Sequence, residues 1–217
     1  MTANIYKQEY TAILHEIERM GITVIENLEN ALQAFQTLDT KLADSVIAKD
    51  DEIDKLQIEI NDTTIKFMAT RQPVAQNLRE LVSIFKICTS LERIGDYTVH
   101  IAKEAKRLAE NNCPHSLVEL EAIILDGIQM LKDALNAFLK DDVEAAYKIA
   151  KRDDEIDRRY KLFLKNIILL MTTDSARSDM YSRLLSTSNS VERLCDHIVD
   201  ICEAIVYICE GIYVDLN

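Results

Sequence analysis

Apolar residues return every three or four positions along nearly the whole chain, which is the spacing of one face of an α-helix. In the first such segment, from about residue 5 to residue 35, the stripe comprises Ile13, Ile17, Met20, Val24, Leu28, Leu32 and Phe35. Five more segments follow. We expect them to run from Asp39 to Thr70, from Val74 to Glu110, from Ser116 to Phe138, from Asp141 or Asp142 to Met171, and from residue 176 to residue 212. The pattern predicts an all-α protein of six helices, with no strand longer than a few residues.

Turn-forming residues are rare, with only 4 glycines and 2 prolines in the 217-residue chain. Asp39 is suited to cap the second helix, and Pro73 to end it and to begin the third. Ser116 and Glu119 form a capping box for the fourth helix. Residues 111–115, Asn-Asn-Cys-Pro-His, are the clearest break in the chain.

The two halves of the chain resemble each other. Residues 49–54, Lys-Asp-Asp-Glu-Ile-Asp, match residues 152–157, Arg-Asp-Asp-Glu-Ile-Asp, at an offset of 103 positions. The motif Glu-Arg-x-x-Asp occurs at residues 92–96 and again at residues 192–196, at an offset of 100. A repeat this long is unlike the period of a solenoid. It predicts two pseudo-symmetric three-helix bundles from an internal duplication, with the boundary between residues 112 and 113.

The sixth segment has the most regular apolar stripe, formed by Val191, Leu194, Ile198, Ile201, Ile205, Ile208 and Ile212. Three of the five cysteines, Cys195, Cys202 and Cys209, recur every seven residues along this segment. Because the chain contains no Cys-x-x-Cys, we interpret these cysteines as small apolar packing residues in a reducing compartment.

Acidic residues outnumber basic ones, 37 to 25, and give a net charge of −12. Binding to nucleic acid relies on Lys and Arg that neutralise phosphates, so this balance argues against it. It favours a multivalent cation or the basic surface of a partner protein. The N-terminus lacks the pattern of a signal peptide, and Asp200, Glu203 and Glu210 interrupt the most apolar segment. We therefore expect a cytoplasmic protein with no membrane span.

Four pairs of carboxylates are spaced four residues apart, so the members of each pair lie on one side of their helix. The pairs are Asp50 and Asp54, Glu92 and Asp96, Asp153 and Asp157, and Glu192 and Asp196, with Asp200 and Glu203 continuing the last pair. Two like charges about 4 Å apart repel by about 1 kcal/mol in water and by about 4 kcal/mol at an effective dielectric constant near 20. Such pairs are either a solvated acidic face or a binding site, and their recurrence in both halves favours the site.

If the two motif helices of each half are neighbours, four carboxylates converge in each half. An all-oxygen site suits hard cations such as Mg²⁺, Mn²⁺ or Ca²⁺, and iron and zinc are further candidates. Gly95 lies between Glu92 and Asp96 in the sequence. Its lack of a side chain either admits a close neighbour or a metal-bound water at this site, or it serves helix packing alone. No Glu-x-x-His motif is present, which excludes a ferritin-like di-iron site. No nucleophile–base pair or phosphate-binding loop supports catalysis either.

At these residues the chain resembles the PhoU family of phosphate-uptake regulators. The resemblance covers essentially the whole chain and is most specific at residues 50–54, 72–75 with 78–79, and 91–96. It implies two pseudo-symmetric three-helix bundles with multinuclear metal sites built from the four carboxylate pairs. It also implies a negative regulator of phosphate homeostasis, not an enzyme, that connects a phosphate ABC transporter ATPase with a sensor histidine kinase. We expect such a protein to form a homodimer.

The first half departs from the family motif, because Lys103 stands where the second half has Glu203. A fixed ammonium opposes a bound cation unless its long stem carries the charge into water. We therefore expect the second half to bind a divalent cation more tightly than the first. The alternative hypothesis is a metal-independent adaptor whose acidic helix faces dock a basic partner surface directly. A third hypothesis, an enzyme with a carboxylate-bound metal, has no motif in its support.

Overall fold

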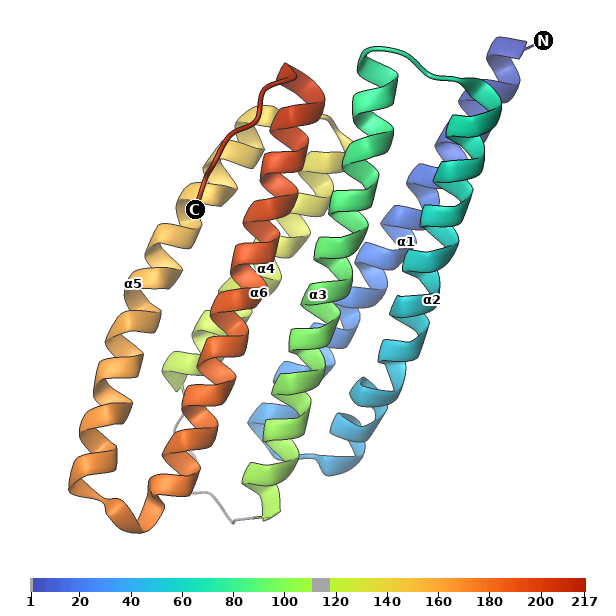
Figure 1. The fold of residues 1–217 in the computed structure, drawn as a ribbon. Helices are drawn as coiled ribbons and strands as arrows, with labels where there is room; N and C mark the ends of the chain where they lie inside the picture. Colours follow the sequence, from blue (N-terminus) through green and yellow to red (C-terminus); the bar gives the residue numbers. More distant parts are fainter. Residues whose placement is uncertain (1, 111–117) are drawn as a thin grey trace.

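The structure, a computed structural model, describes residues 2–110 and 118–217. The described residues form long α-helices and one short 3-10 helix and contain no strand (Figure 1). The elements are α1 (Thr2–Thr37), α2 (Thr40–Arg71), α3 (Gln76–Glu110), α4 (Val118–Leu139), α5 (Val143–Thr173), η1 (Ser175–Arg177) and α6 (Ser178–Glu210). The prediction of an all-α fold is confirmed.

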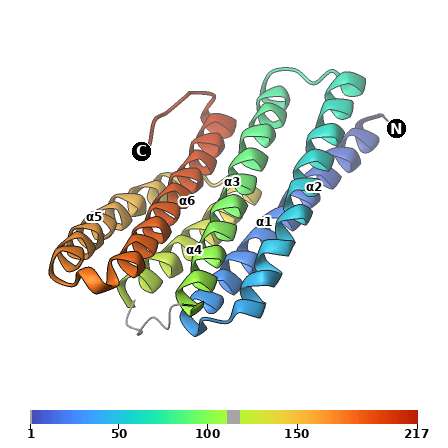
Figure 2. The same cartoon turned by 60° about the horizontal axis from the view of Figure 1, so that its bottom comes forward.

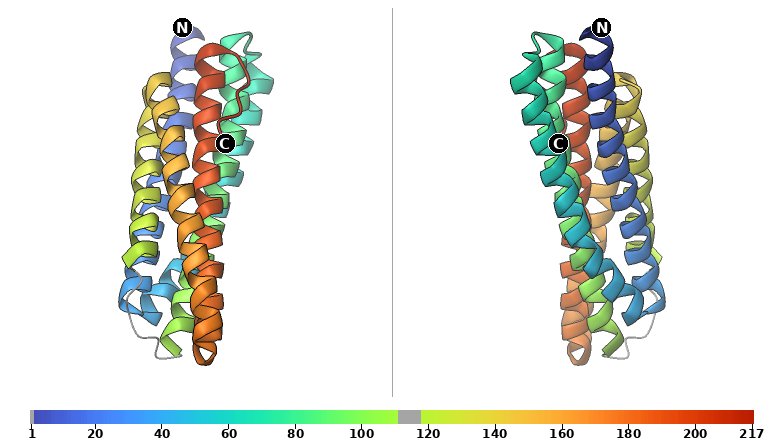
Figure 3. Two further views of the ribbon diagram at one scale, coloured as in Figure 1. Left: turned by 90° about the vertical axis from the view of Figure 1, so that its left-hand side faces the viewer. Right: turned by 90° about the vertical axis from the view of Figure 1, so that its right-hand side faces the viewer.

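The helices form two layers. In Figure 1, α5, α6, α3 and α2 lie next to one another in front, and α4 and α1 lie behind them, as the side views of Figure 3 also show. Figure 2 gives the same order of the four front helices from another angle. Within each half the three helices pack against one another, and the halves meet where α3 packs on α6 and α1 on α4. The buried apolar residues of all six helices form one continuous core.

The antiparallel pair α3–α6, which we call the seam, joins the halves at the centre of the front layer (Figure 1). Tyr97 of α3 and His197 of α6 occupy equivalent positions in the two repeats. Their rings stack on each other, with centroids 5.9 Å apart and planes inclined by 23°. A contact between equivalent residues is expected close to a pseudo-twofold axis. The repeat in the sequence is therefore also a repeat in space.

Side-chain caps fix the beginnings of two helices. Asp39 accepts hydrogen bonds from the backbone N–H groups of Lys41 and Leu42, at 2.9 and 3.1 Å, and caps α2 as predicted. At the start of α5 the cap is Asp142, which accepts from the N–H of Ala145 at 2.9 Å. This observation decides between the two aspartates that the sequence offered.

Some boundaries differ from the prediction. α3 begins at Gln76 instead of Val74, because Ala75 has a φ of +50° and so lies outside the helical region. α6 ends at Glu210, since Gly211 adopts a left-handed φ of +72°, and Ile212 is therefore not part of the helical stripe but 51% exposed. The predicted domain boundary and the capping residue Ser116 lie outside the described residues, and both stay predictions.

The apolar stripes otherwise form the core. Every predicted stripe residue of α1 is buried, and so are all those of α6 from Val191 to Ile208. Cys88, Cys195 and Cys202 are buried, Cys209 is partly buried, and all four are free thiols. Cysteines on these helices therefore pack as small apolar side chains, as the sequence predicted.

Candidate functional site

The first carboxylate cluster lies between α2 and α3 and consists of Asp50 and Asp54 of α2 with Glu92 and Asp96 of α3. Burial raises the pKa of Asp50, and the negative charges of Asp54 and Asp96 raise it further. The pKa of Glu92 is also raised, first by burial and then by the charges of Asp96, Asp54 and Asp50. The carboxylates of the two motifs therefore influence one another's ionisation across α2 and α3.

Gly95 allows α2 and α3 to approach each other beside this cluster. A Cβ atom at position 95 would lie 3.3 Å from Ile53 Cδ1 and 3.6 Å from Asp50 Oδ1. Ile53 fills the space, so the glycine serves helix packing, and it also brings Asp50 close to α3. Asp50 Oδ1 is buried and has no hydrogen-bond partner within residues 2–110 and 118–217. Such an orphaned acceptor is the kind of group that a cation or a water satisfies.

The second carboxylate cluster lies between α5 and α6 and consists of Asp153 and Asp157 of α5 with Glu192 and Asp196 of α6. Asp153 is only 9% exposed. Burial raises its pKa to about 7, assisted first by the charge of Asp157 and then by that of Asp196. The pKa values of Asp196 and Glu192 are also raised, in both cases mainly by burial. This arrangement repeats the first cluster.

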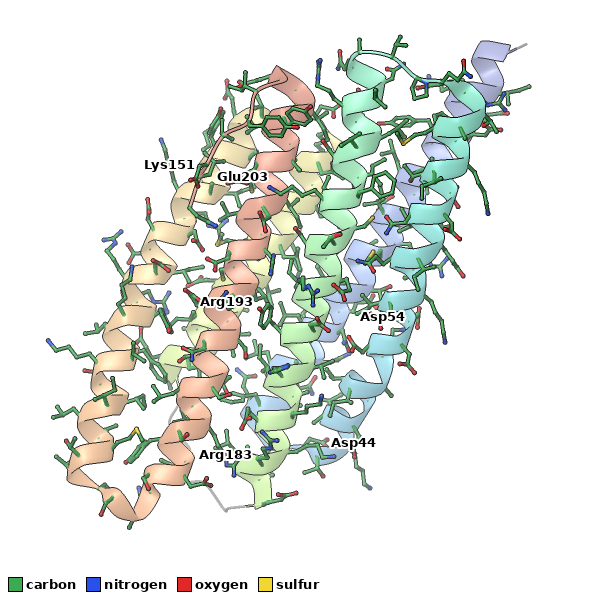
Figure 4. All side chains as sticks on the ribbon, viewed as in Figure 1. Asp44, Asp54, Lys151, Arg183, Arg193 and Glu203 are labelled. Carbon is green, nitrogen blue, oxygen red and sulfur yellow. The ribbon has the colours of Figure 1, made fainter. Side chains whose placement is uncertain are left out.

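Both clusters are half-buried, so neither is a fully solvated acidic face. Except for the exposed Asp54 and the buried Asp153, their members are partly shielded from solvent. The rear of the front layer is covered by α1 and α4. Figure 4 shows Asp54 on α2 and, on α6, Arg193, which follows Glu192 of the second cluster.

Basic side chains already accompany some of these carboxylates. Arg93 donates a hydrogen bond from Nη1 to Asp96 Oδ2 at 2.8 Å, and Lys161 donates to Asp157 Oδ2 at 2.6 Å. Lys103 lies close enough to Asp50 for its positive charge to lower the pKa of that carboxyl group, against the effect of burial. Lys103, whose equivalent in the second half is Glu203, therefore lies near the first cluster.

Asp200 and Glu203 belong to the seam more than to the second cluster. Lys86 of α3 lies 3.1 Å from Asp200 Oδ1 and 2.7 Å from Glu203 Oε2. Asp200 also interacts with His197 Nδ1 at 3.0 Å, and its pKa is lowered mainly by this hydrogen bond. Sequence analysis missed Lys86. The available signal was that Lys86 has a serine, Ser186, as its equivalent in the second repeat.

The donor set of the clusters fits a hard cation in its chemistry, since every member is a carboxylate. The carboxylates of each cluster repel one another, and this repulsion contributes to the raised pKa values. A bound cation would offset the repulsion. Across the part of the chain that the structure describes, however, no group of three or more His, Cys, Asp or Glu side chains is arranged so that it could hold a metal ion. A cation at either cluster therefore requires side-chain rotation.

Within residues 2–110 and 118–217, no helix is both long and apolar enough to cross a membrane.

The fold and these clusters define a class of protein: a duplicated all-helical bundle in which each repeat carries paired carboxylate motifs on neighbouring helices. The family model described as the PhoU domain matches residues 17–105 and again residues 126–205. The chain belongs to the PhoU family.

Two relatives match along their full length. The chain is 33% identical to a phosphate-specific transport system accessory protein PhoU homolog of Clostridium acetobutylicum, with 100% of both chains covered. It is 34% identical to a protein of the same description from Streptococcus pneumoniae serotype 4, covering 97% of this chain and 100% of the relative.

Solved structures agree with the fold. The crystal structure of PhoU from Pseudomonas aeruginosa superposes with a TM-score of 0.93 at 30% identity, covering 95% of this chain and 100% of that one. The phosphate transport system regulatory protein PhoU from Streptococcus pneumoniae gives a TM-score of 0.89 at 31% identity, covering 97% and 99%. The resemblance inferred from the sequence motifs is therefore confirmed, and the relatives are named as accessory or regulatory proteins of phosphate transport.

Proposed function

We propose that this protein is a cytoplasmic negative regulator of phosphate uptake, which couples a phosphate ABC transporter to a sensor histidine kinase and restrains the phosphate-starvation response. The observation that carries the proposal is the similarity, over the full chain, to proteins named accessory proteins of phosphate-specific transport systems. The chain acts by docking and not by catalysis, and we propose that it works as a homodimer.

In this proposal the docking surface is the acidic front of the bundle. The two carboxylate clusters lie in the same layer of helices, between α2 and α3 and between α5 and α6, on either side of the seam. Divalent or iron-type cations held by Asp50, Asp54, Glu92 and Asp96, and by Asp153, Asp157, Glu192 and Asp196, would neutralise these clusters and present the metal to a partner. The orphaned Asp50 Oδ1 supports this role.

The alternative is a metal-independent adaptor in which basic side chains of the partner bind the clusters directly. The observation that favours it is that Arg93 and Lys161 already pair with Asp96 and Asp157. These contacts indicate that the clusters accept cationic side chains in suitable geometry.

The test uses the full chain and the purified ATPase subunit of a phosphate ABC transporter. We expect Asp157→Asn with Glu192→Gln to weaken binding at least tenfold, measured by biolayer interferometry at fixed ionic strength. The matched control is Glu144→Gln with Asp179→Asn, which removes the same charge from exposed positions and should change binding less than twofold. Equal binding by all three proteins would contradict the proposal. A chelator separates the two mechanisms, because only the metal-bearing one is sensitive to it.

A further inference from the structure

The first turns of α1 cover the end of α2. Tyr6 and Tyr10 lie against Phe67, with ring centroids 4.9 and 6.4 Å away, and Phe67 is only 4% exposed. Glu9 Oε1 accepts a hydrogen bond from Arg71 Nη2 at 2.6 Å. In Figure 1 these turns of α1 run beside α2 toward its end at the top of the view. The first repeat therefore closes this surface with a helix of its own.

The described residues of the second repeat contain no counterpart of these turns. By the offset of 103, α1 residues 5–14 correspond to residues 108–117, which comprise the last residues of α3 and residues that the structure does not describe. Among the described elements α5 packs only on α4, η1 and α6, and α4 begins at Val118. The joined ends of α5 and α6 extend beyond α4 at the bottom of Figures 1 and 3. Leu170, the counterpart of Phe67, is accordingly 42% exposed.

Two exposed leucines on α5 replace charged residues of α2. Glu59 and Lys66 line the hollows between α2 and α1, so these positions face the covering helix. Their counterparts are Leu162 and Leu169, which are 57% and 62% exposed. Burying two leucines against a partner gains hydrophobic free energy, whereas charged side chains at a rim remain in water. The exchange favours a partner that covers the end of α5.

Methionine replaces glutamate on the neighbouring helix as well. In the first repeat burial raises the pKa of Tyr10, and the charge of Glu80 on α3 raises it further, so Glu80 lies close to the covering helix. Its counterpart on α6, at the offset of 100, is Met180, which is partly buried. Methionine adapts its unbranched side chain to different apolar partners. We define the end surface as Leu162, Phe163, Leu169, Leu170 and Met180.

The charge around the end surface differs from that of its counterpart. Residues 158–173 contain four basic side chains and no acidic one, whereas the equivalent residues 55–70 contain two of each. Three of the four pair with carboxylates of this chain, and the fourth, Lys165, is exposed one turn from both Leu162 and Leu169. Pairing of two end surfaces would bring the Lys165 side chains of two copies together. An acidic partner complements this charge instead.

We propose that the end surface binds an amphipathic α-helix of a partner protein, in the place that α1 takes in the first repeat. The helix presents aromatic or aliphatic side chains at positions i, i+4 and i+7, which is the spacing of Tyr6, Tyr10 and Ile13 in α1. An acidic residue of the helix lies beside Lys165. The site is separate from the carboxylate clusters and does not depend on their occupancy by a cation.

The chain itself supplies a probe, since α1 covers the equivalent surface of the first repeat. The probe is a fluorescein-labelled peptide with the sequence of residues 2–18 that carries Glu9→Gln, because Asp174 stands where the first repeat has Arg71. Fluorescence anisotropy follows its binding to the full chain. We expect saturable binding to the wild-type chain, and its absence would contradict the proposal.

Leu162→Glu with Leu169→Lys gives the end of α5 the charged residues of α2 and should weaken peptide binding at least tenfold. The matched control, Ile58→Glu with Ile65→Lys, introduces the same charges at exposed positions of α2 that are also seven residues apart. It should change binding less than twofold. Circular dichroism and thermal unfolding establish that both variants are folded. Unchanged binding by the first variant, or an equal loss in the control, would overturn the assignment.

The acidic character of the partner has its own test. Lys165→Glu should weaken binding of the peptide by about threefold at low ionic strength, and by less in high salt. Tighter binding by this variant would contradict an acidic partner helix.

Two further measurements separate a partner helix from other occupants. In analytical ultracentrifugation the chain with Leu162→Glu and Leu169→Lys should sediment as the wild-type chain does. A loss of association would assign the end surface to a second copy of the chain instead. Replacing residues 111–117 by a Gly-Ser linker of equal length should leave peptide binding unchanged. A tenfold gain would assign the surface to that segment of the chain, and the proposal would be wrong.

Discussion

The two carboxylate clusters are made from the same residue types at the same spacing, and yet their environments differ. In the first, the helix position between the motif residues is Gly95, and Lys103 supplies a positive charge that lowers the pKa of Asp50. In the second, the corresponding position is Cys195, and Glu203 is drawn away to Lys86 across the seam. Residues other than the motif carboxylates therefore decide how much charge each cluster retains.

The environments of the two clusters differ most at the equivalent aspartates Asp153 and Asp50. Asp153 is 9% exposed and its pKa is raised to about 7, whereas Asp50 is less buried and its pKa is raised by less. Burial is the largest cause in both cases. For Asp153 each of the next causes is a further carboxylate, while for Asp50 the lysine opposes them. The second cluster therefore gains more from a bound cation.

The largest expected effect is on the pH dependence of stability. In the folded state Asp153 binds its proton up to about pH 7, whereas the unfolded chain releases it near 3.8. The folded state thus holds more protons between these values, and stability falls as the pH rises through this window. Asp153→Asn should therefore raise the free energy of unfolding by about 2 kcal/mol at pH 8, about half of what the pKa difference implies. Urea unfolding at pH 5 and pH 8 with a chelator measures it.

The matched variant in the first cluster is Asp50→Asn. Because the pKa of Asp50 is raised by less, its replacement should stabilise the chain by less at pH 8 and should leave most of the pH dependence in place. A larger gain from Asp50→Asn than from Asp153→Asn would reverse our ranking of the clusters.

The next effect concerns packing under the first cluster. Gly95→Cys gives the first repeat the residue of the second, but the new Cβ would lie 3.3 Å from Ile53 Cδ1, and Ile53 is fully buried. Overpacking of this kind costs about 1–3 kcal/mol, and the better helix propensity of cysteine offsets less than about 1 kcal/mol of it. Guanidinium unfolding should show a net loss of stability. A neutral or stabilised variant would mean that α2 moves away freely.

The sequence was sufficient for the helices, their stripes and the pairing of motifs, because these depend on periodicity and on short-range caps such as Asp39. It did not reveal where α6 stops, since Ile212 continues the apolar spacing and only the backbone conformation of Gly211 ends the helix. It also did not reveal Lys86, because the partners of an ion pair across the seam lie more than a hundred residues apart in the chain.

The candidate site was predicted less completely than the fold. Spacing put the eight cluster carboxylates on neighbouring helices, as the structure has them, but it assigned Asp200 and Glu203 to the second cluster along with them. On a helical projection Glu203 does share their side of α6. Its contacts with Lys86 Nζ and with the backbone N–H of Leu216, which only the packed structure contains, give it a different role.

Replacing Lys103 is expected to have the smallest effect. Lys103→Gln removes the positive charge near Asp50 and should raise the pKa of that carboxyl group further. The shift reflects a partly exposed pair and should change stability by less than about 1 kcal/mol. Carboxyl-carbon NMR titration of Asp50 in both proteins measures it. An unchanged pKa would show that the lysine charge points into solvent, and a lowered pKa would contradict the assigned role outright.

Calorimetric titration of the metal-free chain with Mn²⁺ decides whether the two clusters bind cations unequally. We expect two binding events of different affinity. Asp196→Ala should remove the tighter event and Asp96→Ala the weaker one. Equal affinities in the wild-type chain would contradict the role assigned to Lys103, and the absence of binding at both clusters would refute the metal-bearing mechanism in favour of the metal-independent adaptor.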